Sequence, residues 1–192
     1  MLNLYLLHLE KGKDMFVTRE LTINDLHPDL LQHFNRYQEV RRCLRRENDK
    51  WVLKDISFVE QWDEPLKKEI VTVDFMNCLN SGGVVWGVFN ERNELIAFAS
   101  LLSDFFGSEG QYLQLMQIHT SYEYRNKGIG KELFKVSAEK ARFLGAKKLY
   151  ISTHSSEESQ HFYEKIGCVD AQEINKKLAE HEPYDRQMEF IL

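Results

Sequence analysis

The stretch "YRNKGIGKELF", residues 124–134, places two glycines two positions apart behind two basic residues and then continues with helical spacing. The first amide protons of a helix have no backbone partner and carry roughly half a positive charge, so they attract an anion. Glycine leaves those amides uncovered, because it has no side chain to keep phosphate oxygens away. Gly128 and Gly130 therefore predict a diphosphate-binding turn at the start of a helix over residues 131–144. The alternative is a glycine turn that only packs this helix against a strand.

Two common nucleotide-binding motifs do not fit this turn. A dinucleotide fingerprint requires a third glycine at the position of Leu133, and a P-loop requires glycine at the position of Arg125. The bound group is therefore expected to be a diphosphate of another kind. Arg125 and Lys127 are expected to attract it at long range, while the successive amides of residues 126–131 form a concave anion site.

Hydrophobic periodicity predicts the other elements of the chain. Strands are expected over residues 16–21, 83–90, 95–102, 111–120, 147–153, 169–174 and 187–192, and helices over 24–46, 58–79, 131–144 and a short segment that ends before Gly167. Pro65 interrupts the second helix in this prediction, and Ser155 with Glu158 forms a capping box for the last one. The segment from 111 to 153 reads as strand, turn, helix and strand, which predicts that its two strands run parallel.

Length and charge predict one soluble globular domain. A chain of 192 residues can bury one good core, and no apolar run approaches the roughly 20 residues that cross a bilayer, so no membrane partner is expected. The formal net charge is −5 and most basic residues are dispersed. The exception is a group that is expected to form one solvated helix face: Arg41, Arg42, Arg45 and Arg46. This distribution makes nucleic acid an unexpected partner.

The cysteines and the N-terminus add two further expectations. Three cysteines lie far apart and form no CxxC motif, which is typical of free thiols in a reducing compartment: Cys43, Cys78 and Cys168. A cytoplasmic protein without a metal site is therefore predicted. Residues 1–14 lack the features of a signal peptide, and a first core strand opens at Met15. The prediction is an N-terminal extension over 1–14 and a domain over 15–192, with an extra edge strand as the alternative for the extension.

Several segments in this order resemble the GNAT superfamily of acyl-CoA-dependent N-acetyltransferases. The family's pyrophosphate loop, [RQ]-x-x-G-x-[GA], is matched by Arg125, Gly128 and Gly130. The hairpin "GVVWGVFNERNELIAFASLL" and the segment "HFYEKIGC" are similar to the family's corresponding parts. The resemblance implies an α/β fold, with a mixed central sheet of about six to seven strands flanked by about four helices. The sheet is expected to splay open between its fourth and fifth strands, which are residues 111–120 and 147–153.

A local feature of the strand before the loop favours such a splay. In "LQLMQI", residues 113–118, apolar side chains fall at Leu113 and Leu115 and then at Met116 and Ile118, so the alternation slips by one position. A β-bulge produces this slip. A central strand that is buried on both faces is an equally weighted alternative.

The resemblance also implies that acetyl-CoA is bound as the acyl donor. Its pantetheine arm is expected to bond to the main chain near Ile118 and Thr120. Ser156 and Ser159 occupy the positions where many family members have asparagine and alanine, so Ser156 is either a substitute pantetheine contact or only a helix cap. The residues assigned to acetyl-CoA in this way are Ile118, His119, Thr120, Arg125, Asn126, Lys127, Gly128, Ile129, Gly130, Lys131, Ser156, Ser159 and Tyr163.

The catalytic assignments rest on the same resemblance. Tyr163 is expected to be the general acid that protonates the leaving thiolate, with a packed aromatic side chain beside Phe162 as the alternative. His119 is the imidazole next to the expected splay and the candidate base, although a structural histidine, Glu109 or a water chain are alternatives. The acidic loop "EHEPYDRQ", residues 180–187, is either an attractant for a cationic amine or a solvated turn.

The expected activity is transfer of an acetyl group from acetyl-CoA to a primary amine in a ternary complex. A small cationic acceptor is favoured by aromatic and acidic residues in a predicted helical acceptor region: Trp51, Asp55, Phe58, Trp62 and Asp63. A protein N-terminal or lysine acetyltransferase and a non-catalytic acyl-CoA-binding regulatory module are the two alternatives. A homodimer is the oligomeric state to test.

Overall fold

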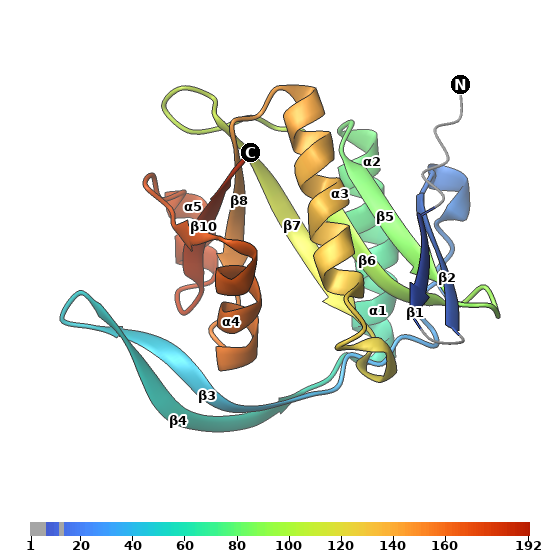
Figure 1. Ribbon diagram of the computed structural model, residues 1–192, viewed down its shortest axis with the longest axis horizontal. Helices are drawn as coiled ribbons and strands as arrows, with labels where there is room; N and C mark the ends of the chain where they lie inside the picture. The colour runs from blue at the N-terminus through green and yellow to red at the C-terminus, as the bar shows by residue number, and fades with distance from the viewer. Residues whose placement is uncertain (1–6, 12–13) are drawn as a thin grey trace.

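The computed structural model describes residues 7–11 and 14–192, with side chains from Met15 onward. Within these residues an eight-stranded sheet has the order β1-β2-β5-β6-β7-β8-β10-β9, and β3 and β4 form a separate hairpin (Figure 1). The strands are β1 (Leu7–Lys11), β2 (Asp14–Glu20), β3 (Gln38–Glu47), β4 (Lys50–Glu60), β5 (Val84–Phe89), β6 (Leu95–Leu101), β7 (Tyr112–Thr120), β8 (Lys148–Thr153), β9 (Val169–Asp170) and β10 (Arg186–Ile191). The helices are α1 (Glu64–Glu69), the π-helical η2 (Ile70–Phe75), α2 (Met76–Asn80), α3 (Ile129–Leu144), α4 (Glu157–Ile166) and α5 (Lys176–His181), with short 3₁₀ turns η1 (Ile23–Asp25) and η3 (Tyr122–Tyr124).

The sheet is mixed and splays open between β7 and β8. These two strands are parallel, as predicted, but they pair only where Tyr112–Gln114 faces Lys148–Tyr150. On the other side of β7, Gln117 lies opposite Ser100 and Leu115 lies opposite Leu101, so Met116 is an extra residue. The predicted bulge in β7 is therefore confirmed, and it lies next to the point where β7 and β8 separate.

Helices cover both faces of the sheet. Figure 1 shows α3 and α4 on the near side and α1 and α2 on the far side. Alternate side chains of β5 contribute to two hydrophobic clusters: Trp86 and Val88 belong to the cluster that contains α3, whereas Val85 and Phe89 belong to the one that contains Phe75 of η2. The central strands read as continuous apolar runs because both of their faces are buried.

The helix predicted over residues 24–46 is wrong. The chain forms η1 and further turns and then strand β3, so the expected arginine face lies on a strand. Val40 and Cys43 are both buried and lie three residues apart, which imitates helical spacing. The register shift between Val40 and Arg42 places its extra residue in β4, where Ile56 and Ser57 lie opposite Arg41. The hairpin turn is made by Asn48 and Asp49, both with positive φ (49° and 62°), as two-residue hairpin turns require.

The second predicted helix starts later than expected. Phe58 belongs to β4, and the helical segment begins at Glu64 with Asp63 as its N-cap. Pro65 lies in the first turn, where its missing amide proton costs no hydrogen bond, so it starts this helix and does not interrupt it. Trp51, Asp55 and Phe58 therefore lie on a strand, not in a helical acceptor region.

The C-terminal part of the chain also differs in detail from the prediction. Ser156, not Ser155, is the N-cap of α4 and accepts a hydrogen bond from the Ser159 amide. The strand expected over 169–174 is only the two-residue β9, and α5 was not predicted. Gly167 ends α4 in the left-handed conformation, as predicted, with a φ of 104°.

The β3–β4 hairpin reaches across to α4. The Leu44 amide donates to the Ser155 carbonyl (2.8 Å), and the Arg45 guanidinium donates to the Ser155 hydroxyl (2.9 Å). Arg42 forms an ion pair with Glu157 at the first turn of α4 (2.7 Å). Figure 1 shows the hairpin crossing below the splayed end of the sheet. The hairpin therefore covers one side of the opening between β7 and β8.

At the opposite edge of the sheet, β1 pairs antiparallel with β2, with Leu7 opposite Thr18. The domain boundary at residue 15 stays a prediction, and residues 1–6 and 12–13 lie outside the described part of the chain. Cys43, Cys78 and Cys168 are buried free thiols. None of the helices in the described residues is long and apolar enough to cross a membrane.

Candidate active site

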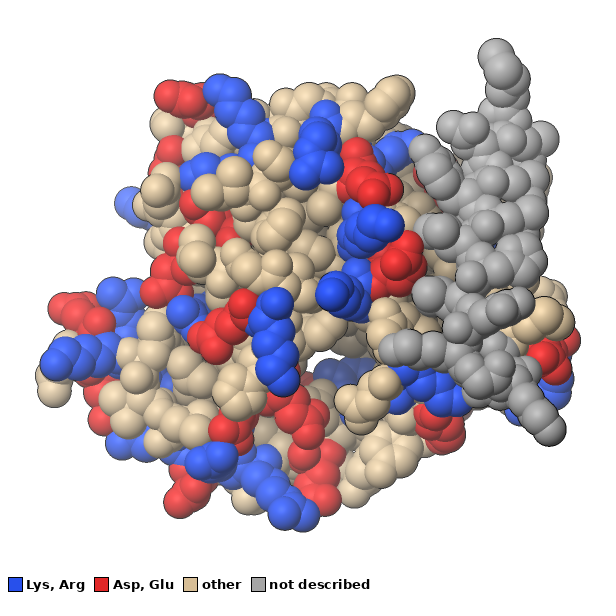
Figure 2. All heavy atoms as spheres, in the orientation of Figure 1, with Lys and Arg blue, Asp and Glu red and all other residues tan. Residues whose placement is uncertain are grey.

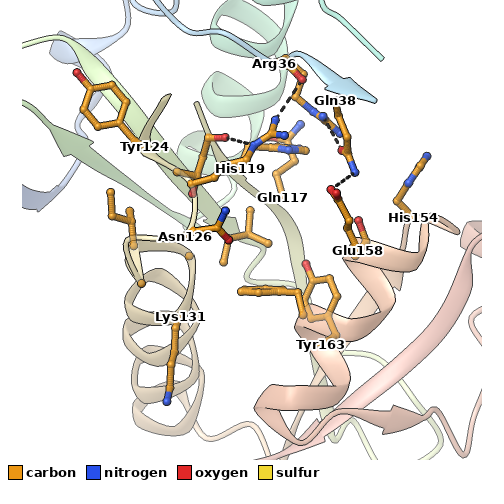
Figure 3. Close-up of a pocket in the computed structure, with 18 of the residues that line it drawn as sticks. Arg36, Gln38, Gln117, His119, Tyr124, Asn126, Lys131, His154, Glu158 and Tyr163 are labelled. Carbon is orange, nitrogen blue, oxygen red and sulfur yellow. Dashed lines mark hydrogen bonds between the residues drawn. The ribbon is translucent and has the colours of Figure 1, made fainter. Parts of the chain in front are cut away.

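A cavity of about 510 Å³ opens where β7 and β8 separate. In Figure 3, Asn126 and Lys131 lie on one side, Glu158 and Tyr163 of α4 on the other, and Arg36 and Gln38 at one end. Figure 2 shows an opening on the face that carries α3 and α4, bordered by side chains of both charges. The predicted site residues that line the cavity are Ile118, His119, Thr120, Arg125, Asn126, Gly128, Ile129, Gly130, Lys131, Ser159 and Tyr163, whereas Lys127 and Ser156 do not line it.

The glycine turn has a distinct structural requirement at each glycine. Gly128 has a φ of 82° and is the N-cap of α3, so it occupies the left-handed region that favours glycine. A Cβ atom on Gly130 would lie 3.3 Å from the Phe162 ring and 3.8 Å from the Thr120 hydroxyl oxygen. The helix therefore begins at the wall of the cavity, where glycine leaves its first amides uncovered. This arrangement suits an anion such as a diphosphate.

Arg125 has a role that the motif did not predict. Its Nε donates to the Thr120 carbonyl (3.1 Å) and its Nη2 donates to the Arg36 carbonyl (3.3 Å). The side chain thereby ties the end of β7 to the segment that leads into β3. The ammonium of Lys127 lies 5.3 Å from the centre of the Tyr124 ring. Both cations thus have contacts within the protein besides any attraction to an anion.

Tyr163 is almost fully buried on α4. Its ring packs edge-on against Phe162 and Phe134, with ring centres 5.0 Å and 6.3 Å apart. Burial raises the pKa of Tyr163 well above its usual value, with smaller contributions from Cys168 and Asp185. The phenol therefore stays protonated at neutral pH and presents a hydroxyl proton to the cavity (Figure 3).

His119 lies on β7 among aromatic rings. Its imidazole is 4.8 Å from the Trp62 ring and 5.4 Å from the Phe98 ring, measured between centres. Burial, and then the charges of Arg36 and Arg125, hold the pKa of His119 well below its usual value. The ring is therefore neutral at pH 7, but a low pKa makes it a weak proton acceptor.

Ser156 and Ser159 are joined to each other by a 3.0 Å hydrogen bond between their hydroxyls. Ser156 is buried and its oxygen caps α4, which is the alternative that the sequence left open for it. Ser159 lies one turn further along the helix and lines the cavity.

The end of the cavity beside the hairpin is built by residues that the sequence did not single out. Arg36 is buried and donates to the Glu60 carboxylate (2.6 Å) and to the Gln38 side-chain oxygen (2.8 Å). Arginine is only a donor, so it turns the Gln38 amide nitrogen toward the Glu158 carboxylate, 3.2 Å away. Gln38 thereby gives the Glu158 carboxylate a hydrogen-bond donor at the wall of the cavity.

His154 lies beside this network. Its Nδ1 accepts a hydrogen bond from the Ser156 amide (3.2 Å), and its Nε2 lies 3.4 Å from the Glu60 carboxylate. No signal in the sequence could identify His154, Arg36 or Gln38, because residues 24–46 were predicted as a helix. The contacts of His154 with Glu60 and of Gln38 with Glu158 also join residues more than 90 positions apart.

Comparison with known proteins agrees with this geometry. The sequence model of the Acetyltransferase (GNAT) family matches residues 36–168. The chain belongs to this family of acetyltransferases. A comparison with curated protein sequences finds no match.

Solved structures of other GNAT proteins share the fold of this GNAT chain. Nourseothricin acetyltransferase is 14% identical with a TM-score of 0.66, and the match covers 92% of this chain and 98% of that one. A GNAT family acetyltransferase from Elizabethkingia anophelis with acetyl-CoA bound is 17% identical (TM-score 0.55; 92% and 98% covered). PaiA N-acetyltransferase from Thermoplasma acidophilum in complex with coenzyme A is 15% identical (TM-score 0.56; 92% and 99% covered). At these identities the likeness shows the fold, and it confirms the predicted splayed α/β architecture.

On the far side of the sheet, the GNAT chain places two carboxylates behind residues that line the cavity. Gln117 donates to Asp74 on the π-helical turn (2.9 Å), and burial raises the pKa of Asp74. Ser152 of β8 donates to Asp185 in the loop before β10 (3.3 Å). In the part of the chain that the structure describes, no group of His, Cys, Asp or Glu side chains is arranged to hold a metal ion. The site therefore has an anion cradle, formed by the uncovered amides at the turn of Gly128 and Gly130, together with a buried phenol and several carboxylates.

Proposed function

We propose that this chain is an N-acetyltransferase that moves the acetyl group of acetyl-CoA to the primary amine of a small cationic molecule, by direct attack in a ternary complex. The observation that carries the proposal is the single cavity shared by the turn of Gly128 and Gly130 and by the hydroxyl of Tyr163. An anion cradle and a proton donor are two features that acyl transfer from a coenzyme A thioester uses. Two solved relatives hold acetyl-CoA or coenzyme A, which supports the choice of donor.

The cavity fits acetyl-CoA in two independent ways. The uncovered amides at the start of α3 suit the diphosphate, and a side chain at position 130 would intrude on this space. In the described part of the sheet, residues 115–120 of β7 face β8 without pairing with it, so their backbone groups can bond to the amides of a pantetheine arm. The cavity volume of about 510 Å³ is ordinary for a ligand pocket, since such pockets measure about 300–1,000 Å³.

Different groups of the chain have separate roles in the proposed reaction. Acetyl-CoA supplies an acyl group that is activated as a thioester. Backbone amides near Ile118 to Thr120 stabilise the oxyanion that develops on the carbonyl, and Tyr163 gives its proton to the departing sulfur. The rings of Trp62 and Phe98 pack against His119, which lines the cavity next to these backbone amides.

The β3–β4 hairpin supports a small acceptor over a peptide. It bonds to the start of α4 through Leu44 and Ser155 and covers one side of the opening, where a peptide would need an open groove. Glu158 at the wall of the cavity and the acidic side chains behind it favour a cationic acceptor. The acceptors to test first are polyamines, aminoglycosides and nourseothricin, the last because one solved relative is named for it.

The test is an assay of thiol release from acetyl-CoA with a panel of small cationic amines and lysine-containing peptides. Saturable turnover with a small amine, and not with peptides, is the expected result. Turnover with peptides alone would favour a protein acetyltransferase. Tight acetyl-CoA binding without turnover on any acceptor would favour the non-catalytic acyl-CoA-binding module.

A further inference from the structure

Ser152 lies in the splayed part of the sheet, at the wall of the cavity. It lies on β8 beyond Tyr150, the last residue that pairs with β7. Its neighbours Ile151 and Thr153 are buried, whereas Ser152 is half-buried and is one of the residues that line the cavity, together with His119 and Tyr163. Because side chains alternate along a strand, Ser152 points to the sheet face opposite Ile151, whose side chain packs in the cluster that contains α3.

A series of hydrogen bonds that begins at Asn175 leads to Ser152. The Asn175 amide donates to the Tyr150 hydroxyl (3.0 Å), and that hydroxyl donates to the Gln187 side-chain oxygen (2.8 Å). The Gln187 amide nitrogen then donates to the Ser152 oxygen (2.8 Å), and the Ser152 hydroxyl donates to Asp185 (3.3 Å). Every bond in this chain runs in the same direction, and it ends at the carboxylate.

The direction of these hydrogen bonds is set by groups that can only donate or only accept. The Gln187 amide nitrogen also lies 3.4 Å from the Asp185 backbone carbonyl, which has no proton to give, so the nitrogen must face this way. Ser152 therefore accepts from Gln187, and its own hydrogen is directed to Asp185. A hydroxyl oxygen has two acceptor sites, so the second one remains for a group inside the cavity.

The surroundings of Asp185 favour uptake of a proton. Burial, followed by repulsion from Glu182, raises the pKa of Asp185 to about 6, and Glu60 at the end of β4 adds to the effect. Two other titratable groups on this side are His154, directly after β8, and Tyr163 of α4, and Asp185 in turn raises the pKa of Tyr163. The carboxylate and the phenol are thus close enough to affect each other's charge.

We propose that Asp185 accepts the proton of the attacking amine through Ser152, a role that rests on the acetyl transfer proposed above. The nitrogen forms its bond to the thioester carbonyl carbon and the carbon–sulfur bond breaks. One proton passes from the nitrogen to the Ser152 oxygen while the Ser152 hydroxyl proton passes to Asp185. The sulfur receives one proton from Tyr163, and exchange with water afterwards restores Tyr163 and Asp185. One proton therefore leaves nitrogen and one reaches sulfur.

The other titratable groups at the cavity are less suited to this role. Both ring nitrogens of His154 already have partners, the Ser156 amide and Glu60. His119 holds a proton weakly, and Glu158 receives the Gln38 amide. Asp185 combines a raised proton affinity with a directed hydroxyl that reaches the cavity, which none of these three groups offers.

The first test compares kcat/KM for the best amine in the wild type, Asp185→Asn, Ser152→Ala and the double variant. Each single change is expected to lower kcat/KM about 10²-fold or more, the usual size of a lost general base. The double variant should be no slower than the slower single variant, because both residues serve one proton path. Calorimetry should show unchanged acetyl-CoA affinity, and Asp185→Glu should restore part of the rate.

The pH profile separates proton uptake from a structural role. For the wild type, log(kcat/KM) should steepen as the pH falls below about 6, because Asp185 becomes protonated in addition to the amine. Asp185→Asn should remove this additional steepening below about pH 6, which we call the second limb of the profile. Glu182→Gln should move it to lower pH, because a repelling charge is lost.

Asp170→Asn is the matched control, since Asp170 is an exposed aspartate paired with Arg186 and its loss should leave the rate and the profile unchanged. An Asp185→Asn enzyme within threefold of the wild type, with the second limb still present, would overturn the proton path while leaving acetyl transfer intact. A wild type that acetylates no amine would overturn the proposed function and the proton path with it.

Discussion

The ring of Phe162 on α4 lies so close to Gly130 at the start of α3 that a Cβ atom on residue 130 would come within 3.3 Å of it. The two helices that border the cavity therefore touch through a glycine. The next residue along α4 is Tyr163, so the position of the phenol depends on this contact. A single methyl group at position 130 would therefore disturb both the anion-binding amides at the start of α3 and the position of the Tyr163 phenol.

Gly130→Val should therefore reduce both acetyl-CoA affinity and turnover. The branched side chain must displace Phe162, and with it Tyr163, because even its Cβ atom would approach the ring more closely than ordinary van der Waals contact. Calorimetry and steady-state rates measure the two effects. A folded variant with normal kcat would show that Phe162 moves without Tyr163.

Gly128→Val should weaken acetyl-CoA binding by about 2 kcal/mol or more without moving α4, because a β-branched residue resists the left-handed conformation and covers the amides. The native φ of 82° at this position is the cause. Calorimetry on the folded variant measures the change. Unchanged affinity would refute the assignment of this turn to the diphosphate.

Tyr163→Phe should lower the turnover rate about 10²–10⁴-fold, the usual range for general acid catalysis, while acetyl-CoA affinity changes little. The ring and its packing against Phe134 and Phe162 are retained, and only the hydroxyl proton is lost. The measurement is the acetyl-transfer rate at saturating acetyl-CoA with the best amine. A rate within threefold of the wild type, with chemistry shown to limit turnover, would mean that another group protonates the sulfur.

Asp185→Asn should make the protein more stable to heat above pH 6 and have little effect well below it. The pKa of Asp185 is raised from 3.8 to about 6 by burial and by Glu182, so the folded state favours the protonated form and loses stability as the pH rises from the first value to the second. Asparagine carries no charge at any pH and escapes this loss. Melting temperatures at about pH 4 and about pH 8 test it, since the loss is small near the unfolded pKa and complete above the folded one. Equal melting temperatures of the wild type and Asp185→Asn at the higher pH would show that the charge of Asp185 does not destabilise the folded state.

Removal of residues 1–14 should leave the fold and acetyl-CoA binding intact. In the described residues, β1 lies at the edge of the sheet and pairs with β2 alone, so its loss exposes a new edge but no part of the cavity. Cooperative thermal unfolding and calorimetry measure the outcome. An insoluble or non-cooperative product would place β1 in the core domain.

The turn of Gly128 and Gly130, the helix after it and the slip at Met116 could be read from the sequence because each signal lies within one element or its immediate neighbour. A left-handed glycine, an amphipathic stripe and a shifted alternation are properties of local backbone geometry. The motifs in this order carried the resemblance to the family, and that resemblance implied the splayed sheet, which the slip at Met116 favoured.

The hairpin and the far side of the cavity were decided by tertiary structure. The buried residues Val40 and Cys43 have the spacing of a helix, and only pairing with β4 and contact with α4 made this segment a strand. The path through Gln187, Ser152 and Asp185 depends on β10 lying antiparallel to β8, which brings residues more than 30 positions apart into hydrogen-bond distance. Such contacts leave no periodic trace in either segment, because hydrogen bonds between side chains depend on where the strands meet and not on spacing along the chain.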